Sequence, residues 1–305
     1  MKDFKQHINV LTVLLFVCIS LSVTDSALGQ AGDLNTLQER AKKAGIEQSI
    51  IDDLKVRKES RGLTNEQLIA IIEPAVALAE DNLPANHVLQ KALEGLSKGV
   101  PDAQIVPYIN SMANATRQAA GVVDPWLENP GVKKMVEAED HRAGPNSVRN
   151  RMVESSSRAI NQNISPDEVS QLLSDIGDKS VMSKTTPSNI ISAMDILPDL
   201  PMQDQPQLTR SFVIRALKGG FEAAEFQKLP MALNMAQKRS QIPAANIVEG
   251  IANQLQRGTP AQDILRNLFD GNIGGGPPGN IPKGMEDNPG RGNNGNRGTG
   301  NNGTL

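Results

Sequence analysis

The segment Pro84–Pro101, PANHVLQKALEGLSKGVP, has a counterpart in Pro243–Pro260, PAANIVEGIANQLQRGTP. In both segments the two prolines are 17 positions apart, and apolar residues coincide at a constant offset of 159. The matched pairs are Val88 with Ile247, Leu89 with Val248 and Leu96 with Leu255, followed beyond the second proline by Ile105 with Ile264, Val106 with Leu265 and Ile109 with Leu268. The sequence therefore predicts an internal repeat in which prolines precede helices.

Each copy also contains a signal for the end of its first helix. Lys98 and Gly99 in the first copy match Arg257 and Gly258 in the second. Glycine adopts the left-handed conformation that ends many helices, and a cation in the last turn is favoured by the helix dipole. Gly95 lies inside the same predicted helix, where glycine costs about 1 kcal/mol relative to alanine.

A third, weaker copy begins at Thr186-Pro187, where Ile191 and Ile196 take the places of Val88 and Leu93. Three further prolines, at 198, 201 and 206, then interrupt the pattern. The copies are unevenly spaced, which indicates a divergent array rather than a regular one.

Upstream of each copy we expect an amphipathic helix, over residues 65–82, 166–182 and 222–240. The first two helices are each preceded by a capping box, in which a hydroxyl residue is followed three positions later by Gln or Glu: Thr64 with Gln67, and Ser165 with Glu168. The predicted unit is thus two or three short helices. Such units stack, because one pair of helices cannot cover its own apolar face.

Apolar residues recur at helical spacing from Leu34 to Leu268, and we find no run with the alternation typical of a strand. The predicted fold class is all-α, a divergent helical-repeat array of stacked helix pairs, solenoid-like or compact. We expect an N-terminal unit over residues 33–120, a hinge and connecting helix over 121–145, and C-terminal units over 146–270. The hinge is assigned to GVVDPWLENPG because this segment combines two prolines with two glycines.

The two ends of the sequence differ from the repeats. Residues 1–29 have the layout of a secretory signal peptide, with lysines before an apolar run and small residues at Ala27 and Gly29. We expect cleavage after Gly29, with cleavage after Ala31 or an uncleaved anchor as alternatives, and a protein that is exported to the periplasm or secreted. Residues 271–305 are rich in Gly, Asn and Pro, a composition that predicts disorder.

Composition excludes several classes of function. Cys18 is the only cysteine and lies in the predicted leader, so a mature chain would have neither a disulfide nor a cysteine nucleophile. The formal net charge of -3 argues against nucleic acid or an anionic membrane surface as partner, because both attract basic proteins. We also expect no membrane span after signal cleavage.

Three motifs match cofactor or metal sites only in part. Gly274–Gly279 fits the dinucleotide pattern G-x-G-x-x-G, but its prolines remove backbone amides and no helix follows. Asp270-Gly-Asn272 begins like a calcium loop, yet Gly274 and Ile281 stand where oxygen ligands are needed. Glu137 and His141 are one helical turn apart but have no predicted third ligand. We therefore assign no cofactor-binding and no metal-binding residues.

One segment has a catalytic resemblance. Val153-Glu154-Ser155, followed by Asn163 and Ser165, resembles the Glu–Ser motif of lytic transglycosylases. The resemblance implies that Glu154 is a general acid, a role that needs a raised pKa in an apolar cleft. The Gly-Leu-Met-Gln run of that family is absent, and Gln171-Leu-Leu-Ser stands instead. His87 has no acid or nucleophile at a telling spacing in the sequence, so we assign no catalytic residue.

These observations predict a non-enzymatic helical-repeat scaffold or binding protein of the cell envelope or extracellular space. Its expected partner is a protein or another envelope macromolecule. The alternatives are a cell-wall lytic enzyme with Glu154 as general acid, and a carrier that holds a small molecule or lipid in a groove between helices.

Overall fold

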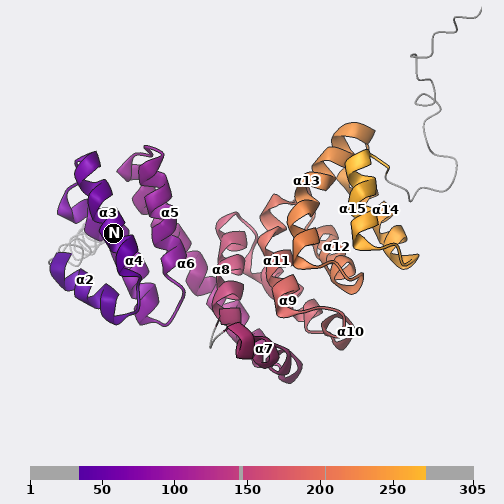
Figure 1. Cartoon of the computed structure of the whole chain (residues 1–305), viewed down its shortest axis with the longest axis horizontal. Coiled ribbons are helices and arrows are strands. Elements are labelled where there is room, and N and C mark those ends of the chain that lie inside the picture. The colour runs from indigo at the N-terminus through magenta and orange to yellow at the C-terminus, as the bar shows by residue number, and fades with distance from the viewer. Residues whose placement is uncertain (1–33, 144–146, 203, 273–305) are drawn as a thin grey trace, which may run out of the picture.

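The computed structural model describes residues 34–143, 147–202 and 204–272, apart from the side chains of 140–143. Within these ranges the chain is all-α, as predicted, with fourteen α-helices, one 3₁₀ turn and no strand. The helices follow one another along the longest axis of the molecule (Figure 1). They are α2 (Leu34–Lys43), α3 (Gln48–Arg61), α4 (Asn65–Glu80), α5 (Asn86–Ser97), α6 (Asp102–Leu127), α7 (Pro130–Ala143), α8 (Ser147–Asn161), α9 (Pro166–Ile176), α10 (Lys179–Met182), α11 (Pro187–Asp195), the 3₁₀ turn η1 (Leu197–Asp199), α12 (Pro206–Lys218), α13 (Ala223–Ser240), α14 (Ala244–Gln256) and α15 (Ala261–Asp270).

Both predicted capping boxes are present. The hydroxyls of Thr64 and Ser165 accept hydrogen bonds from the backbone N–H three residues on, and the side chains of Gln67 and Glu168 accept from the cap N–H in return. Each box fixes the first turn of its helix, α4 or α9. The helices predicted over 65–82 and 222–240 correspond to α4 and α13.

The prediction of one helix over residues 166–182 was wrong. The chain leaves the helix at Gly177, and Asp178 then accepts a hydrogen bond from the backbone N–H of Ser180 to start the separate helix α10. An aspartate in this place competes for backbone donors, which favours a new helix start over continuation.

Most helices end in the same way, with one residue in the left-handed region. A positive φ is found at Gly45, Gly62, Gly99, Gly220, Gly258 and Gly271, and at Asn82, Asn163 and Gln241. At the two matched glycines, Gly99 and Gly258, the next residue donates its N–H to a carbonyl five residues back, in Gly95 and Gln254 respectively. This is the Schellman motif, and it turns the chain sharply toward the next helix.

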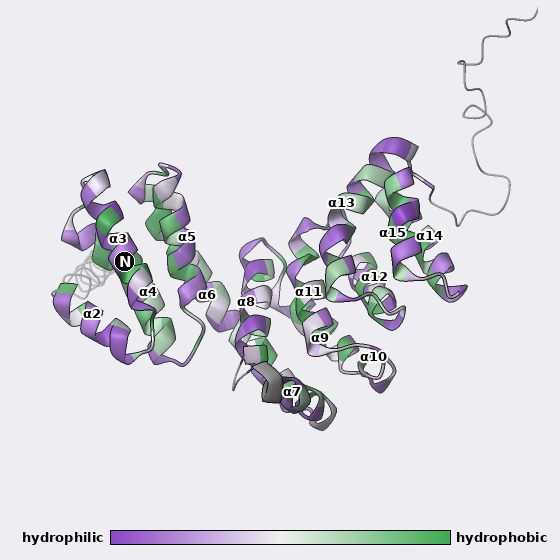
Figure 2. Ribbon diagram, viewed as in Figure 1, coloured by the Kyte–Doolittle hydropathy of each residue, from purple (hydrophilic) through white to green (hydrophobic). Residues whose placement is uncertain are grey.

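Alternate helices along the chain pack side by side. One row of packed helices runs from α2 through α4, α6, α8, α11 and α13 to α15. On the other side α3 packs on α5, and α9 packs on α12, which packs on α14. Hydrophobic and hydrophilic residues alternate around the helices, as expected when each helix packs through one side (Figure 2).

Alternate helices that pack on each other in the N-terminal part run parallel. α3 contacts α5 at both starts, between Glu47 and Asn86, and at both ends, where Arg61 donates to the carbonyl of Val100. α4 contacts α6 in the same sense, since Gln67 bonds Asp102 at the starts of both helices. We call α2 to α6, residues 34–127, the first stack.

Alternate helices of the C-terminal part also run parallel. Asn189 near the start of α11 accepts from the N–H of Ala223 at the start of α13. Arg239 near the end of α13 donates to the carbonyl of Phe269 near the end of α15. We call α8 to α15, residues 147–270, the second stack.

The pair α6 and α8, which joins the two stacks, runs in the opposite sense. Ser111 bonds Asn161, and Asp124 bonds Arg149, so early residues of α6 face late residues of α8. One helix, α7, lies between α6 and α8 in the chain, just as α5 lies between the parallel helices α4 and α6. The number of helices therefore does not account for the reversal, and the two stacks meet at an antiparallel helix pair.

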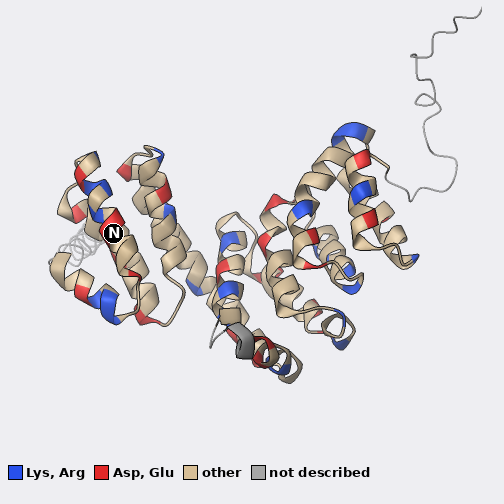
Figure 3. Cartoon of the chain, in the orientation of Figure 1, with Lys and Arg blue, Asp and Glu red and all other residues tan. Residues whose placement is uncertain are grey.

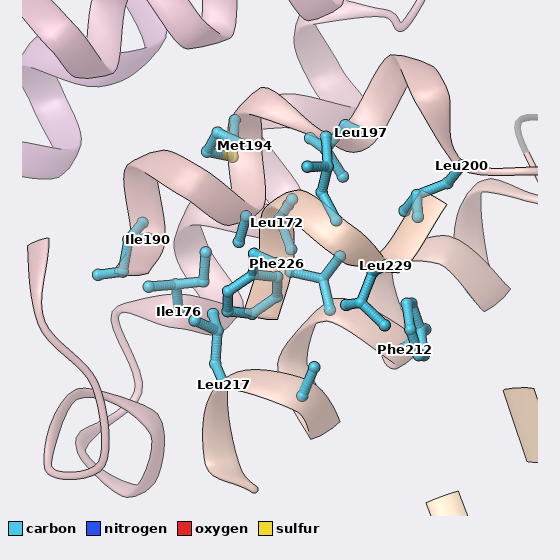
Figure 4. Close-up of a cluster of buried hydrophobic side chains, with 14 of the residues drawn as sticks. Leu172, Ile176, Ile190, Met194, Leu197, Leu200, Phe212, Leu217, Phe226 and Leu229 are labelled. Atoms are coloured by element: carbon cyan, nitrogen blue, oxygen red, sulfur yellow. The ribbon is translucent and has the colours of Figure 1, made fainter. Parts of the chain in front are cut away.

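The buried apolar residues form two clusters that divide within α6. The first core contains residues between Leu37 and Ala113, and the second core contains residues between Ala119 and Leu268. Figure 4 shows part of the second core, where Phe212, Leu229 and Leu200 gather from three segments. The long helix α6 therefore contributes to both cores.

The predicted hinge, residues 121–131, comprises the last turns of α6 and the start of α7, separated by Glu128 and Asn129. The predicted division into units over 33–120, 121–145 and 146–270 stays a prediction. The predicted leader and all of the predicted tail beyond Asn272 lie outside the described residues. Among the helices that the structure describes, none combines the length and the apolar character that crossing a membrane requires.

Candidate functional site at the junction of the stacks

Small side chains line the contact between α6 and α8. Thr116, Ala119 and Ala120 are buried on α6, and Ser156 and Ala159 are buried on α8. Small residues let two helix backbones approach closely, which suits a contact that has to join two separate cores. The Ser156 hydroxyl is buried there without a hydrogen-bond partner among the described residues.

Arg149 connects three helices at one end of this contact. Its Nε and Nη2 atoms donate to the two carboxylate oxygens of Asp124 at 2.7 and 2.9 Å, and its Nη1 donates to the backbone carbonyl of Asn82 at 3.0 Å. The bidentate geometry is the strongest form of an arginine–carboxylate pair. The start of α8 is thereby held to the ends of α4 and α6, and both charges are neutralised.

His87 and Glu154 meet across the same junction. His87 is in the first turn of α5, Glu154 is in the middle of α8, and His87 Nδ1 lies 3.9 Å from Glu154 Oε1. The His87 side chain is 18% exposed and the Glu154 side chain 40%. The two residues that the sequence singled out separately, 67 positions apart, are therefore neighbours in the fold.

The hydrogen bonds around His87 define its tautomer. Thr116 donates its hydroxyl proton to the carbonyl of Met112 at 2.9 Å, so its oxygen accepts from His87 Nε2 at 3.3 Å. This assignment leaves Nδ1 without a proton, and that atom is buried with no hydrogen-bond partner among the described residues. A bare imidazole nitrogen that faces a carboxyl group at 3.9 Å is too distant for a direct hydrogen bond.

Burial shifts the pKa values of both groups toward their neutral forms. Desolvation lowers the pKa of His87 to about 4, and desolvation together with the nearby charge of Asp195 raises the pKa of Glu154. Asp195 is itself paired with Arg158 of α8, at 3.2 Å. A carboxyl group with a raised pKa is what the resemblance to lytic transglycosylases required of Glu154.

A cavity of about 500 Å³ opens beside this junction. Turns of the first stack and the start of α8 form its wall, with Ala44, Gly45, Ile46, Ala79, Asn82, Leu83, Pro84, Ala85, Asn86, Arg149 and Asn150 as lining residues. This volume is within the range of about 300 to 1,000 Å³ that is usual for ligand sites. Neither His87 nor Glu154 is among the lining residues.

The other motifs weighed in the sequence are not brought to the junction. Glu137 is exposed on α7, while the side chain of His141 lies outside the described residues. Asp270 is the exposed last residue of α15, and Gly274–Gly279 and Ile281 also lie outside the described residues. Where the structure describes the chain, no three His, Cys, Asp or Glu residues gather as metal ligands would.

Sequence reasoning missed Arg149, Asp124 and Asn150. Arg149 and Asp124 are 25 positions apart on different helices, so no local spacing could pair them. Acidic and basic side chains are intermingled over the molecule in Figure 3, so no charge run marks the junction either.

Comparisons with known proteins supply no family for this chain. No family model matches it, and neither a curated protein nor a solved structure matches.

Proposed function

We propose that this protein is an exported, non-enzymatic binding scaffold, a divergent array of helix pairs that holds an envelope or extracellular macromolecule at the junction of its two stacks. The observation that carries this proposal is the junction cavity of about 500 Å³. The cavity is formed where both stacks meet, so a partner seated there would contact both.

The alternate-helix packing supports the array part of the proposal. Stacked helix pairs expose long surfaces relative to their cores, and proteins built in this way commonly bind macromolecules. This step is an analogy at the level of the fold, so the partner has to be found at the site itself.

A protein partner or another envelope macromolecule fits the charge distribution better than nucleic acid does. The chain has a formal net charge of -3, and its basic residues are interspersed with acidic ones. Binding to nucleic acid depends on a basic face that neutralises phosphates.

The test is photocrosslinking in the native cells, with p-benzoylphenylalanine at Ala44 in the cavity wall. The matched control carries the same group at Met231, an exposed residue of α13 that is 57% accessible. We expect one adduct of constant mass from Ala44 and none of that mass from Met231. Equal, heterogeneous labelling from both positions would contradict the proposal.

The export part rests on residues 1–29 of the sequence and has its own test. Cells that express the whole chain are fractionated, and the N-terminal residue of the exported protein is sequenced. We expect a chain that begins at Gln30, or at Gly32 after cleavage at the alternative position. An intact chain that stays inside the cell would remove export from the proposal.

Glu154 gives one observation in favour of the lytic enzyme. Its side chain is partly buried beside His87, and its pKa is raised, as a general acid requires. Wild-type protein is incubated with purified cell walls, with Glu154→Gln as the test variant and Glu137→Gln as the matched surface control. Release of muropeptides by wild type and Glu137→Gln, but not by Glu154→Gln, would establish the enzyme and displace the scaffold.

The junction cavity is also large enough for a small molecule, as the carrier alternative requires. Native mass spectrometry of protein purified from its own cells distinguishes this case. A bound compound of defined mass that is lost in Ala44→Trp would favour the carrier.

A further inference from the structure

The junction cavity has polar groups but no free charge. Its one charged lining residue, Arg149, is neutralised by Asp124 in a bidentate pair. Asn86 is also engaged, since its amide exchanges hydrogen bonds with Glu47 at 3.1 and 3.4 Å. A charged ligand would therefore find no counter-charge there.

Two side-chain amides of the cavity wall remain available. In the part of the chain that the structure describes, the side chain of Asn82 has no hydrogen bond, and the Nδ2 atom of Asn150 has none. A carboxamide offers one acceptor and two donors. A peptide group offers one donor and one acceptor, so the two groups can pair reciprocally.

The rest of the wall is apolar. Ala44, Ala79 and Leu83 are partly exposed in it, whereas Ile46, Pro84 and Ala85 are largely buried behind them. Such a surface accommodates an aliphatic side chain. The lining contains no aromatic residue, so it has no flat face on which a sugar ring could stack.

We infer that the junction cavity binds an extended, uncharged peptide segment with small aliphatic side chains, through the amides of Asn82 and Asn150. This inference names the chemistry of the partner and rests on the proposed function. Strand-like peptide groups supply the hydrogen bonds, and alternate side chains enter the cavity.

The experiment uses the mature chain and ligand-observed NMR with two probes. The first probe is a set of N-acetylated, C-amidated pentapeptides of Gly, Ala, Ser and Val, and the second is chitotetraose. The test variant Asn82→Gly removes the amide and keeps a residue that tolerates the positive φ of 56°. The matched control is Asn163→Gly, since Asn163 lies just after α8, has a φ of 71° and does not line the cavity.

We expect wild type and Asn163→Gly to bind the peptides equally, and Asn82→Gly to bind them about threefold more weakly or worse, because one hydrogen bond is lost. Binding of chitotetraose without binding of peptide would overturn the inference, as would binding of neither. Peptide binding that is equal in all three proteins would place the peptide elsewhere and would also overturn it. Failure here leaves the proposed function standing if the Ala44 crosslink still forms.

Discussion

The two stacks follow the same packing rule but fill their cores differently. The first core contains only Leu, Ile, Val, Met and Ala, whereas the second contains Phe212, Phe221, Phe226 and Trp126. In the first stack the helices succeed each other across short turns. In the second, α11 ends after nine residues and the 3₁₀ turn η1 follows it. Buried aromatic rings thus contribute to the packing of the second core, whereas aliphatic side chains alone pack the first.

The matched modules at Pro84–Pro101 and Pro243–Pro260 show the same contrast at one position. In the first stack this position is Gly95, and a Cβ atom built on it would lie 3.4 Å from Ile105 Cγ1, an ordinary contact distance. In the second stack Gln254 occupies that place, is 5% exposed, and accepts a hydrogen bond from Asn267 Nδ2 at 2.9 Å. The position matched in the sequence thus has room for a methyl group in one stack and holds a buried polar contact in the other.

The largest expected effect comes from Phe226→Ala. Phe226 is fully buried and its ring lies 5.9 Å from that of Phe221, so its removal should cost about 3 to 5 kcal/mol of unfolding free energy. Hydrogen exchange measured by mass spectrometry should show faster exchange in the second core and unchanged exchange in the first. Leu89→Ala is the converse control: it should speed exchange in the first core and leave exchange in the second core unchanged. Equal loss of protection in both cores would show that the stacks unfold as one unit.

The pH dependence of stability tests the contact of His87 with the second stack. The pKa of His87 is lowered from 6.5 to about 4 in the folded protein, so the unfolded chain binds more protons between these values. The free energy of unfolding should therefore fall by roughly 3 kcal/mol as the pH falls from 6.5 to 4. The raised pKa of Glu154 has the opposite effect on the free energy of unfolding. The stability that protonated Glu154 contributes is present at low pH and is lost as the pH rises above 4.5.

His87→Gln removes the pH dependence that the lowered pKa of His87 causes. Urea titrations at several pH values measure the free energy of unfolding of wild type and variant. We expect the decline below pH 6.5 to become much shallower than in wild type. Glu154→Gln is the matched control and should make the decline steeper. An unchanged profile in His87→Gln would mean that His87 is exposed and does not form the buried contact.

Glycine substitutions test how tightly each region is packed. A Cβ atom on Gly219, at the end of α12, would lie 2.2 Å from Leu255 Cδ2, so Gly219→Ala should destabilise the second stack by about 1 to 3 kcal/mol. Gly121 lies inside α6 with open space around it, so Gly121→Ala should stabilise the protein by about 0.5 to 1 kcal/mol. Thermal unfolding compares the two. Opposite signs are expected, and a stabilising Gly219→Ala would refute the close approach of α12 and α14.

The smallest effect is expected at Gly95. A methyl group there meets Ile105 at ordinary contact distance, so the gain in helix propensity of about 1 kcal/mol should be retained in part. Gly95→Ala should raise the midpoint of thermal unfolding slightly. The matched change in the second stack, Gln254→Ala, should lower it, because Asn267 loses its partner. A lower midpoint of thermal unfolding in both variants would mean that the first stack has no room for a methyl group at Gly95.

Much of the local structure could be predicted from the sequence. The capping boxes at Thr64 and Ser165 and the glycine that ends α5 are local signals, because their hydrogen bonds connect residues only a few positions apart. The break at Gly177 was missed because a single aspartate after a glycine competes weakly against a continuing apolar pattern.

The candidate site could be predicted only in part. His87 and Glu154 stood out individually, but their proximity depends on the antiparallel pairing of α6 with α8. That pairing depends on contacts between residues 25 and 50 positions apart, Asp124 with Arg149 and Ser111 with Asn161, which no local spacing in a single sequence displays. Asn82 and Asn150 line the cavity for the same non-local reason.

The reversal at the α6–α8 pair is the central claim, and a disulfide test examines it most directly. Cys18 is the only cysteine, so a Cys18→Ser chain accepts engineered pairs without competing thiols. Ser111→Cys with Asn161→Cys should oxidise rapidly to an intramolecular disulfide, because the wild-type side chains are in hydrogen-bond contact at 2.9 Å. Ser111→Cys with Arg149→Cys should not. Rapid oxidation of the second pair instead of the first would show that α8 runs parallel to α6 and would contradict the account.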